Sequence, residues 1–244
     1  ADVFSLDEID AFPPRYNIAP TQPMMMVANM PSGKIGTTLV RWGLVPSWVK
    51  DPQDFTLLLN ARSETVMEKP SFKTAIRHRR TLVPASGFYE WHRPADKTLP
   101  KQAYWIKPKP GPDGSPGIVC FGGLMETWSS VNGSEIDSGC ILTTSANEQM
   151  KDIHHRMPVV IEPKDFERWL DCRNYEPRDM VDLMQPIHDD YFEIIAVGDK
   201  VNKVANSGSD IQDPVDVSNP VVPLKSETKP AKKPTDDPDQ FKLF

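Results

Sequence analysis

The chain has 244 residues, enough for one large domain with its own core, and a formal net charge of −6 at pH 7 that argues against a uniformly basic nucleic-acid binder. Its three cysteines have neither disulfide-framework nor zinc-site spacing, and no apolar run approaches the ~20 residues of a membrane span, so neither a secreted nor a membrane protein is expected. We expect an intracellular protein in which a local basic patch could still bind DNA.

The N-terminal part of the chain is predicted to hold short elements separated by prolines. Residues 1–11 favour a short helix that Ser5 would cap. Residues 24–28 are typical of a buried strand, and the turn after them leads into a second strand that ends near Val40, so the two should form a hairpin. The aromatic segment 41–48 contains a proline and is expected to be irregular.

A basic stretch follows. Residues 71–79 predict a short helix with Ser71 as its N-cap and an apolar side formed by Phe72, Ala75 and Ile76. Between residues 62 and 80, six basic residues stand against two acidic ones, a local charge of +4 in an acidic protein. Such a run either binds an anionic partner or forms an ordinary solvated helix face.

Residues 80–91 hold the most distinctive pattern of the chain. Two short extended pieces are expected around a kink, because Pro84 has no backbone N–H and Gly87 tolerates unusual backbone angles. Glu90 then lies between Tyr89 and Trp91, and burial in such an apolar context would raise its pKa toward values that suit proton transfer at neutral pH. The alternative is a carboxylate that points outward from a half-buried strand.

The second half of the chain predicts further short elements. Strands are expected at 102–107, 118–128, 139–144, 154–161 and 191–197, helices at 163–170 and 177–184, and a helix or turn at 146–153.

The residue patterns exclude several kinds of catalytic site. The chain has no H-E-x-x-H, C-x-x-C, G-x-S-x-G or phosphate-cradling glycine loop, so neither a metal nor another cofactor is expected. Because adjacent side chains of a strand point to opposite faces, only one histidine of a neighbouring pair should enter a site. The remaining candidates are Asn60, Arg62, Glu90 and one of His154 and His155, with Trp42 and Trp48 as aromatic residues expected to be exposed.

Six motifs occur in one order along the chain, and the ordered set is far more specific than any single motif. They are RYNIAPTQ (15–22), RWGLVPSW (41–48), NARSETV (60–66), RRTLVPASGFYEW (79–91), GLMETW (123–128) and DIHHRMPVVI (152–161). Together they resemble the SOS-response-associated peptidase family over about residues 12 to 223. The similarity looks greatest to its human-type branch, the abasic-site-processing proteins, which implies a nuclear protein in a eukaryote and a cytoplasmic one otherwise.

The fold expected from the hairpin signals and the resemblance is of the α+β class. Residues 1–223 should form a single domain of curved, mostly antiparallel sheets with short peripheral helices and a positively charged groove. Residues 224–244 are rich in Lys, Pro and Asp and are predicted to be a flexible tail.

The resemblance implies two groups of site residues. In the catalytic group, Asn60 would hold a terminal amine, Glu90 would shuttle protons, and His154 would protonate the ring oxygen of the sugar. Trp48 would prop the bases apart beside the lesion, and His155 is expected to face away. The DNA-binding group implied is Arg41, Trp48, Arg62, Arg77 and Thr143.

The reaction implied is the covalent capture of an abasic site in single-stranded DNA. An N-terminal cysteine would form a Schiff base with the sugar aldehyde, and its thiol would then close a thiazolidine ring. Self-cleavage of the peptide that precedes this cysteine is a related activity of the family. Here the chain opens with Ala1 and its first cysteine is Cys120, which is expected to be inert in the core. We therefore expect a fragment that lacks its native start.

Two other functions stay open at this point. One is a catalytically silent module that binds single-stranded DNA, and the other is an ordinary intracellular peptidase, for which the chain offers no standard nucleophile and base. The replication machinery is a possible partner through the tail, because residues 240–244 faintly resemble the start of a motif that binds the sliding clamp.

Overall fold

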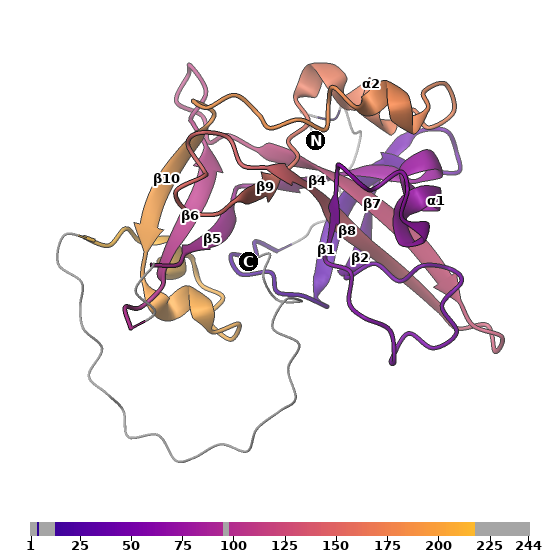
Figure 1. Ribbon diagram of the computed structural model, residues 1–244, viewed down its shortest axis with the longest axis horizontal. Helices are drawn as coiled ribbons and strands as arrows, with labels where there is room; N and C mark the ends of the chain where they lie inside the picture. The colour runs from indigo at the N-terminus through magenta and orange to yellow at the C-terminus, as the bar shows by residue number, and fades with distance from the viewer. Residues whose placement is uncertain (1–3, 5–12, 95–97, 218–244) are drawn as a thin grey trace, which may run out of the picture.

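The computed structural model describes residue 4, residues 13–94 and residues 98–217 (Figure 1). The helix expected over residues 1–11 and the tail expected over residues 224–244 lie outside the described residues, apart from Phe4, which stacks on Phe166. The described part is a mixed α+β domain of two sheets with short helices at one side. The predicted fold class is confirmed.

The larger sheet is built mostly from neighbouring hairpins. Pairing is antiparallel except where β8 meets β2 and β3, and the parallel contact between β2 and β8 closes the sheet on itself. In spatial order its strands are β2 (Ile35–Trp42), β1 (Pro23–Asn29), β4 (Arg80–Ala85), β7 (Val119–Ser129), β8 (Glu135–Ser145) and β3 (Asn60–Arg62), with β9 (Arg156–Pro158) on β8.

The smaller sheet contains β10 (Phe192–Val197), β6 (Gln102–Pro108) and β5 (Phe88–His92), all antiparallel. In Figure 1 it stands at one end of the molecule, beside the larger sheet. The chain passes from one sheet to the other between β4 and β5, where the predicted kink is found. Gly87 allows this passage because a Cβ there would lie 2.4 Å from the Ile106 carbonyl oxygen. Position 87 therefore requires glycine because the Ile106 backbone lies so close to it, and not because its backbone angles are unusual.

Two hydrophobic cores lie on opposite faces of the larger sheet. Alternate residues of each strand enter alternate cores, as the two-residue period of a strand requires. Leu82, for example, packs with the helices, whereas its neighbour Val83 packs against Phe88 and Phe192 of the smaller sheet. The second core contains residues of both sheets and so ties them together.

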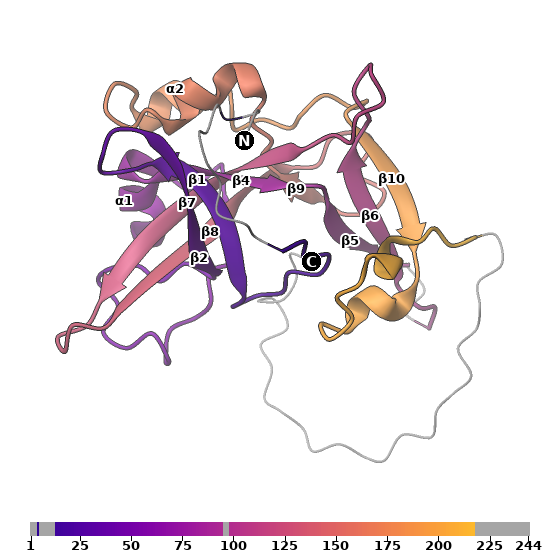
Figure 2. The same ribbon diagram turned by 180° about the vertical axis from the view of Figure 1, so that it is seen from behind.

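The helices α1 (Pro70–His78) and α2 (Phe166–Leu170) cover the face of the larger sheet that lies away from the smaller sheet (Figures 1 and 2). Phe72, Ala75 and Ile76 are the buried side of α1, as predicted. Ser71 is not the N-cap. Pro70 fits the first helical position and forces the residue before it to be extended, so Lys69 is the cap and provides no side-chain hydrogen bond.

The helix predicted at 163–170 is found with those bounds, as a 3-10 turn, η2 (Pro163–Asp165), that continues into α2. The helix predicted at 177–184 is shorter, because only η3 (Pro177–Met180) is helical and turns follow it. Two further 3-10 segments, η4 (Asp199–Asn202) and η5 (Ser209–Gln212), were not predicted. Among the described residues, no helix is long and apolar enough to cross a membrane.

Candidate functional site

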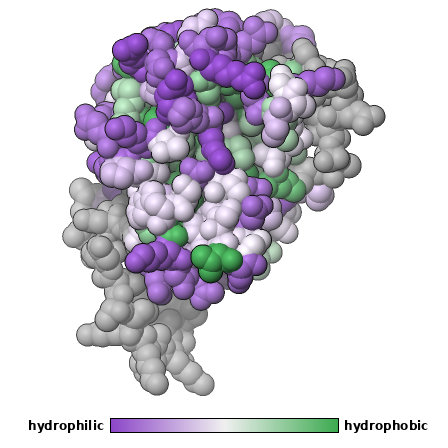
Figure 3. Space-filling model, turned by 90° about the vertical axis from the view of Figure 1, so that its right-hand side faces the viewer, coloured by the Kyte–Doolittle hydropathy of each residue, from purple (hydrophilic) through white to green (hydrophobic). Residues whose placement is uncertain are grey.

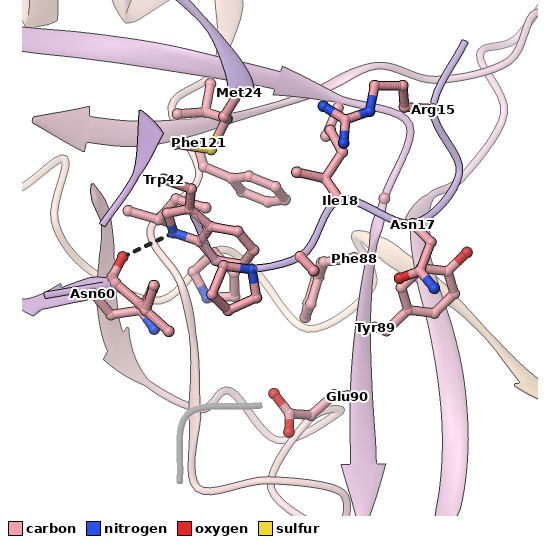
Figure 4. A pocket seen from close by; sticks show the side chains of 18 of the residues that line it. Arg15, Asn17, Ile18, Met24, Trp42, Asn60, Phe88, Tyr89, Glu90 and Phe121 are labelled. Carbon is pink, nitrogen blue, oxygen red and sulfur yellow. Dashed lines mark hydrogen bonds between the residues drawn. The ribbon is translucent and has the colours of Figure 1, made fainter. Parts of the chain in front are cut away.

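A hollow of about 820 Å³ lies at the junction of the two sheets. Its walls include residues of β1, β2, β3, β4, β5, β7 and β8, the extended segment 13–20, and residues just before and within β9. Figure 4 shows that Glu90 and Asn60 reach into it from different strands, with Trp42, Phe88 and Phe121 among the apolar side chains around them. Asn60, Glu90 and His154, the predicted catalytic residues, all line this one hollow.

Glu90 is buried, with only 4% of its surface exposed. It lies on β5 between Tyr89 and Trp91, and its Oε1 accepts a hydrogen bond of 3.2 Å from the Trp91 backbone N–H. Burial raises the pKa of its carboxyl to about 7, while that hydrogen bond and the charge of Arg93 lower the pKa and offset part of the effect. The outward-pointing alternative is therefore wrong for Glu90, and the group can both give and take a proton near neutral pH.

His154 lies beside Glu90. Its Nδ1 is 3.8 Å from Oε2 of Glu90, and it accepts a hydrogen bond of 3.2 Å from the backbone N–H of Arg156. The two histidines do not alternate across a strand, because β9 begins only at Arg156 and both precede it. Their rings lie 4.4 Å apart instead. His155 is exposed and is not part of the lining of the large hollow.

Asn60 begins β3, and its backbone pairs in register with Ile141 of β8. Its side-chain oxygen Oδ1 is buried and has no hydrogen-bond partner among the described residues. A buried acceptor without a donor costs free energy, so this oxygen is a natural place for an N–H group of a ligand. Two residues further on, Arg62 is exposed and pairs in register with Thr143.

Thr143 is buried in the wall of the hollow and is held by Arg156. The guanidinium of Arg156 donates to the Thr143 carbonyl at 2.7 Å and forms a two-point ion pair with Glu64 at 2.6 and 2.9 Å. This pair also lowers the pKa of Glu64. Arg156 and Glu64 were missed at the sequence level, although both belong to quoted motifs, because nothing in the sequence pairs residues so far apart.

The two tryptophans differ in exposure. Trp48 is 57% exposed, as predicted, and packs edge-on against Phe55. The expectation is wrong for Trp42, which is 7% exposed and lines the hollow while its indole N–H donates to the Leu59 carbonyl. The loop that carries Trp48 also supplies Leu57 and its neighbours to the wall of the hollow, but Trp48 itself is not part of that lining.

The basic run between residues 62 and 80 does not form one surface. Only Arg62 lies beside the hollow, and α1 lies across the sheet from it. Arg77 pairs with Glu176, Arg79 pairs with Glu126, and Arg80 is buried and donates to backbone carbonyls such as that of Trp169. The side of the molecule on which α1 lies is mostly hydrophilic, with small separate hydrophobic spots (Figure 3).

The predicted positive groove is thus less positive than expected. The Lys and Arg residues that line the hollow are Arg15 and Arg156, and Arg156 is already paired with Glu64. Arg41, on β2, is half-buried and is absent from the lining of the hollow, which contains its neighbour Trp42. The DNA contacts implied for Arg41 and Arg77 therefore stay predictions.

The extended segment 13–20 forms a wall that the sequence did not reveal. Its Tyr16 carbonyl accepts a hydrogen bond from the Tyr89 hydroxyl at 2.8 Å, and Asn17 donates to the carbonyls of Val201, Lys203 and Asn206. These bonds fasten the segment across the end of the smaller sheet. The motif RYNIAPTQ was its only signal.

Other chemistries find little support in the described residues. No three His, Cys, Asp or Glu side chains gather there in a way that could hold a metal ion. Cys120 and Cys140 are both buried, and burial raises the pKa of the Cys120 thiol to about 12, so the prediction of an inert core cysteine is confirmed. The hollow instead offers a proton donor and acceptor, an imidazole and an amide.

Comparison with known proteins identifies the class. The sequence model of the SOS response associated peptidase (SRAP) family matches residues 2–204, so the chain belongs to this family. Among solved structures, a protein from Bacteroides thetaiotaomicron is 26% identical with a TM-score of 0.68, over 80% of this chain and 82% of that one. A phage-related protein from Bordetella bronchiseptica, 23% identical with a TM-score of 0.63 over 80% of this chain and 87% of that one, shares the fold.

Particular relatives carry more specific names. The abasic site processing protein YoqW of Bacillus subtilis is 36% identical over 212 residues, 85% of this chain and 91% of the relative. The abasic site processing protein HMCES of Pongo abelii is 30% identical over 240 residues, 85% of this chain and 67% of the relative. Because the bacterial protein is the more similar of the two, identity gives the human-type branch only loose support.

Proposed function

We propose that this protein processes abasic sites in single-stranded DNA, with the open-chain sugar held in the hollow between the two sheets. The observation that carries the proposal is the pair formed by Glu90 and His154, which lie 3.8 Å apart in a largely apolar hollow, with the pKa of Glu90 raised to about 7 by burial. The names of the SRAP relatives, abasic site processing proteins, support the same lesion.

The chemistry assigns a role to each of three residues. An α-amine attacks the C1′ aldehyde of the opened sugar, and the resulting carbinolamine loses water to give an imine. Glu90 takes up the proton that the nitrogen releases and returns it to the departing hydroxyl, which a carboxyl with a pKa near neutrality does well. His154 donates to the ring oxygen and so opens the sugar. Asn60 Oδ1, buried without a partner, accepts a hydrogen bond from the amine.

A cysteine as the first residue would complete the reaction as the family resemblance implies. Its thiol adds to the imine carbon and passes its proton to the nitrogen, which closes a thiazolidine ring. Self-cleavage of the peptide before that cysteine would expose the amine. An amine without a neighbouring thiol can form only the imine, which stays reversible.

A heated denaturing gel tests the proposal. The chain is incubated with an abasic single-stranded oligonucleotide and with an intact strand of the same sequence, with and without borohydride. We expect a shifted band only with the abasic strand and only when borohydride reduces the imine. A form of the chain that carries the family's N-terminal cysteine ahead of the RYN motif should give a band that survives heat without reductant. Equal behaviour of the two strands would instead favour a silent DNA-binding module, and a heat-stable band from the unaltered chain would mean that another nucleophile acts.

A further inference from the structure

A second, smaller hollow adjoins the large one. Its volume is about 270 Å³, and Trp91 and His154 line both hollows. The rest of its lining comes from residues 92–93, which follow Trp91, and from the turn before β9. None of its lining residues belongs to β3 or β8, where Arg62 and Thr143 lie. The smaller hollow therefore lies next to Glu90 and His154 but is built from other elements than those that carry Arg62 and Thr143.

The side chains of this smaller hollow suit an anion. Arg93 and Lys151 carry positive charge, and His92 and His155 add two imidazoles that can donate hydrogen bonds. Among the described residues of the lining, Asp152 is the one acid, and Lys151 also forms an exposed ion pair with Glu148. Arg93 is exposed, yet close enough to act on the carboxyl of Glu90. A group bound by Arg93 would therefore be close to the reacting sugar.

We propose that the smaller hollow binds a phosphodiester of the DNA strand, on the opposite side of the lesion sugar from the phosphate that Arg62 contacts. The proposal rests on the proposed function, because a strand with its lesion in the large hollow must leave that hollow in two directions. Arg62 serves one direction, and Arg93 with Lys151 serves the other. The guanidinium and the ammonium group are the usual donors to phosphate oxygens.

Truncated oligonucleotides test this assignment. The probe is a single strand that carries a tetrahydrofuran analogue of the abasic site with nucleotides on both sides, and two shorter strands lack the nucleotides on the 5′ or the 3′ side. For the unaltered chain, each truncation should weaken binding. In the double variant Arg93→Gln and Lys151→Gln, removal of the nucleotides on one side of the lesion should weaken binding no further. In Arg62→Ala, removal of the nucleotides on the other side should weaken binding no further. Each lost charge should weaken binding of the full probe up to about fivefold at low salt, as for one exposed ion contact.

Two further variants serve as controls. Asp152→Asn removes the negative charge of Asp152 from the smaller hollow and should strengthen binding of the full probe. It should not strengthen binding of the truncated strand that lacks the nucleotides bound by the smaller hollow. Lys164→Gln removes an exposed lysine that pairs with Glu162 outside both hollows and should change nothing.

The outcomes separate the two proposals. If the double variant binds each of the three strands with the same affinity as the unaltered chain, the phosphodiester site is overturned. If millimolar inorganic phosphate weakens binding of the full strand and of both truncated strands equally, the proposal is also overturned. The hollow would then be a site for a free anion. If the unaltered chain does not prefer the tetrahydrofuran strand over an intact one, the proposed function fails instead.

Discussion

Burial of the Glu90 carboxyl group reduces the stability of the folded protein when that group is ionised. Its sequence neighbours are aromatic, the His154 imidazole lies 3.8 Å away, and Arg93, whose charge lowers its pKa, lies at an exposed position. Buried carboxylates are normally paired, because an uncompensated charge in the interior is destabilising. A residue that keeps such an arrangement is a candidate for chemistry, since functional sites often retain groups that reduce stability.

This cost predicts a pH-dependent gain in stability for Glu90→Gln. The folded-state pKa of about 7 exceeds the ordinary value of 4.5, so the folded protein holds the proton more tightly and stability falls as the pH rises from about 4.5 through 7. Above pH 7 the variant should be more stable than the unaltered chain by ~3 kcal/mol at most, and below pH 4.5 the two should converge. Urea unfolding at several pH values measures the difference.

A matched variant controls for the loss of any buried carboxyl. Glu126 is also buried, but it pairs with Arg79 at 3.2 Å, so Glu126→Gln should lower stability at pH 8 where Glu90→Gln raises it. A stability difference for Glu90→Gln that stays constant between pH 4 and pH 9 would show that the Glu90 carboxyl is not perturbed.

The same variant should slow the chemistry without weakening DNA binding. Glutamine keeps the shape and polarity of the side chain but cannot exchange a proton. We expect slower formation of the borohydride-trapped imine and, in the form of the chain with the family's N-terminal cysteine, slower reversal of the adduct, with unchanged affinity for the tetrahydrofuran strand. A time course indistinguishable from that of the parent chain would leave Glu90 with a structural role only.

Arg62 is an exposed basic residue that pairs in register with the predicted DNA contact Thr143. Arg62→Ala should weaken binding of single-stranded DNA and flatten the plot of log affinity against log salt by about one unit, the effect of one lost phosphate contact. Titrations at several salt concentrations measure the slope. The same titrations with Arg77→Ala test the contact implied for that residue, and an unchanged slope for Arg62→Ala would contradict its role.

At the scale of elements, the kink between β4 and β5 places Glu90. Gly87→Ala should destabilise the fold by ~1–3 kcal/mol, because the added Cβ would lie 2.4 Å from the Ile106 carbonyl oxygen and 2.7 Å from the Trp105 indole nitrogen. Gly198→Ala is the control, since its nearest neighbour would be at an ordinary 3.6 Å. Thermal unfolding compares the two, and equal effects would mean that the close approach is not limiting.

Local patterns predicted most of the elements, because strand alternation and turn residues act over a few positions. The hairpin of β1 and β2, the apolar side of α1 and the strand break before Glu90 all follow from such patterns. Contacts between distant segments were beyond reach. The closure of β2 on β8, the capture of Arg77 by Glu176 and the pairing of Arg156 with Glu64 depend on the tertiary fold, which no local pattern encodes.

At the scale of the whole molecule, the two sheets act as the two sides of one site. Asn60 and Thr143 come from the larger sheet, Glu90 comes from the smaller one, and His154 comes from the turn before β9. Sequence motifs could name these residues through a family resemblance, but their meeting in one hollow requires the sheets to pack through their shared core. The proton transfer and the DNA binding that we propose would thereby take place at a single junction.

The most direct test of this account is a crystal structure of the chain with a single-stranded oligonucleotide that carries a tetrahydrofuran abasic analogue. We predict that the analogue lies in the large hollow within hydrogen-bonding reach of Glu90 and His154, close to Asn60, and that the strand leaves past Arg62 on one side and past Arg93 on the other. An analogue that lies outside this hollow, or DNA that binds along α1 instead, would contradict the account.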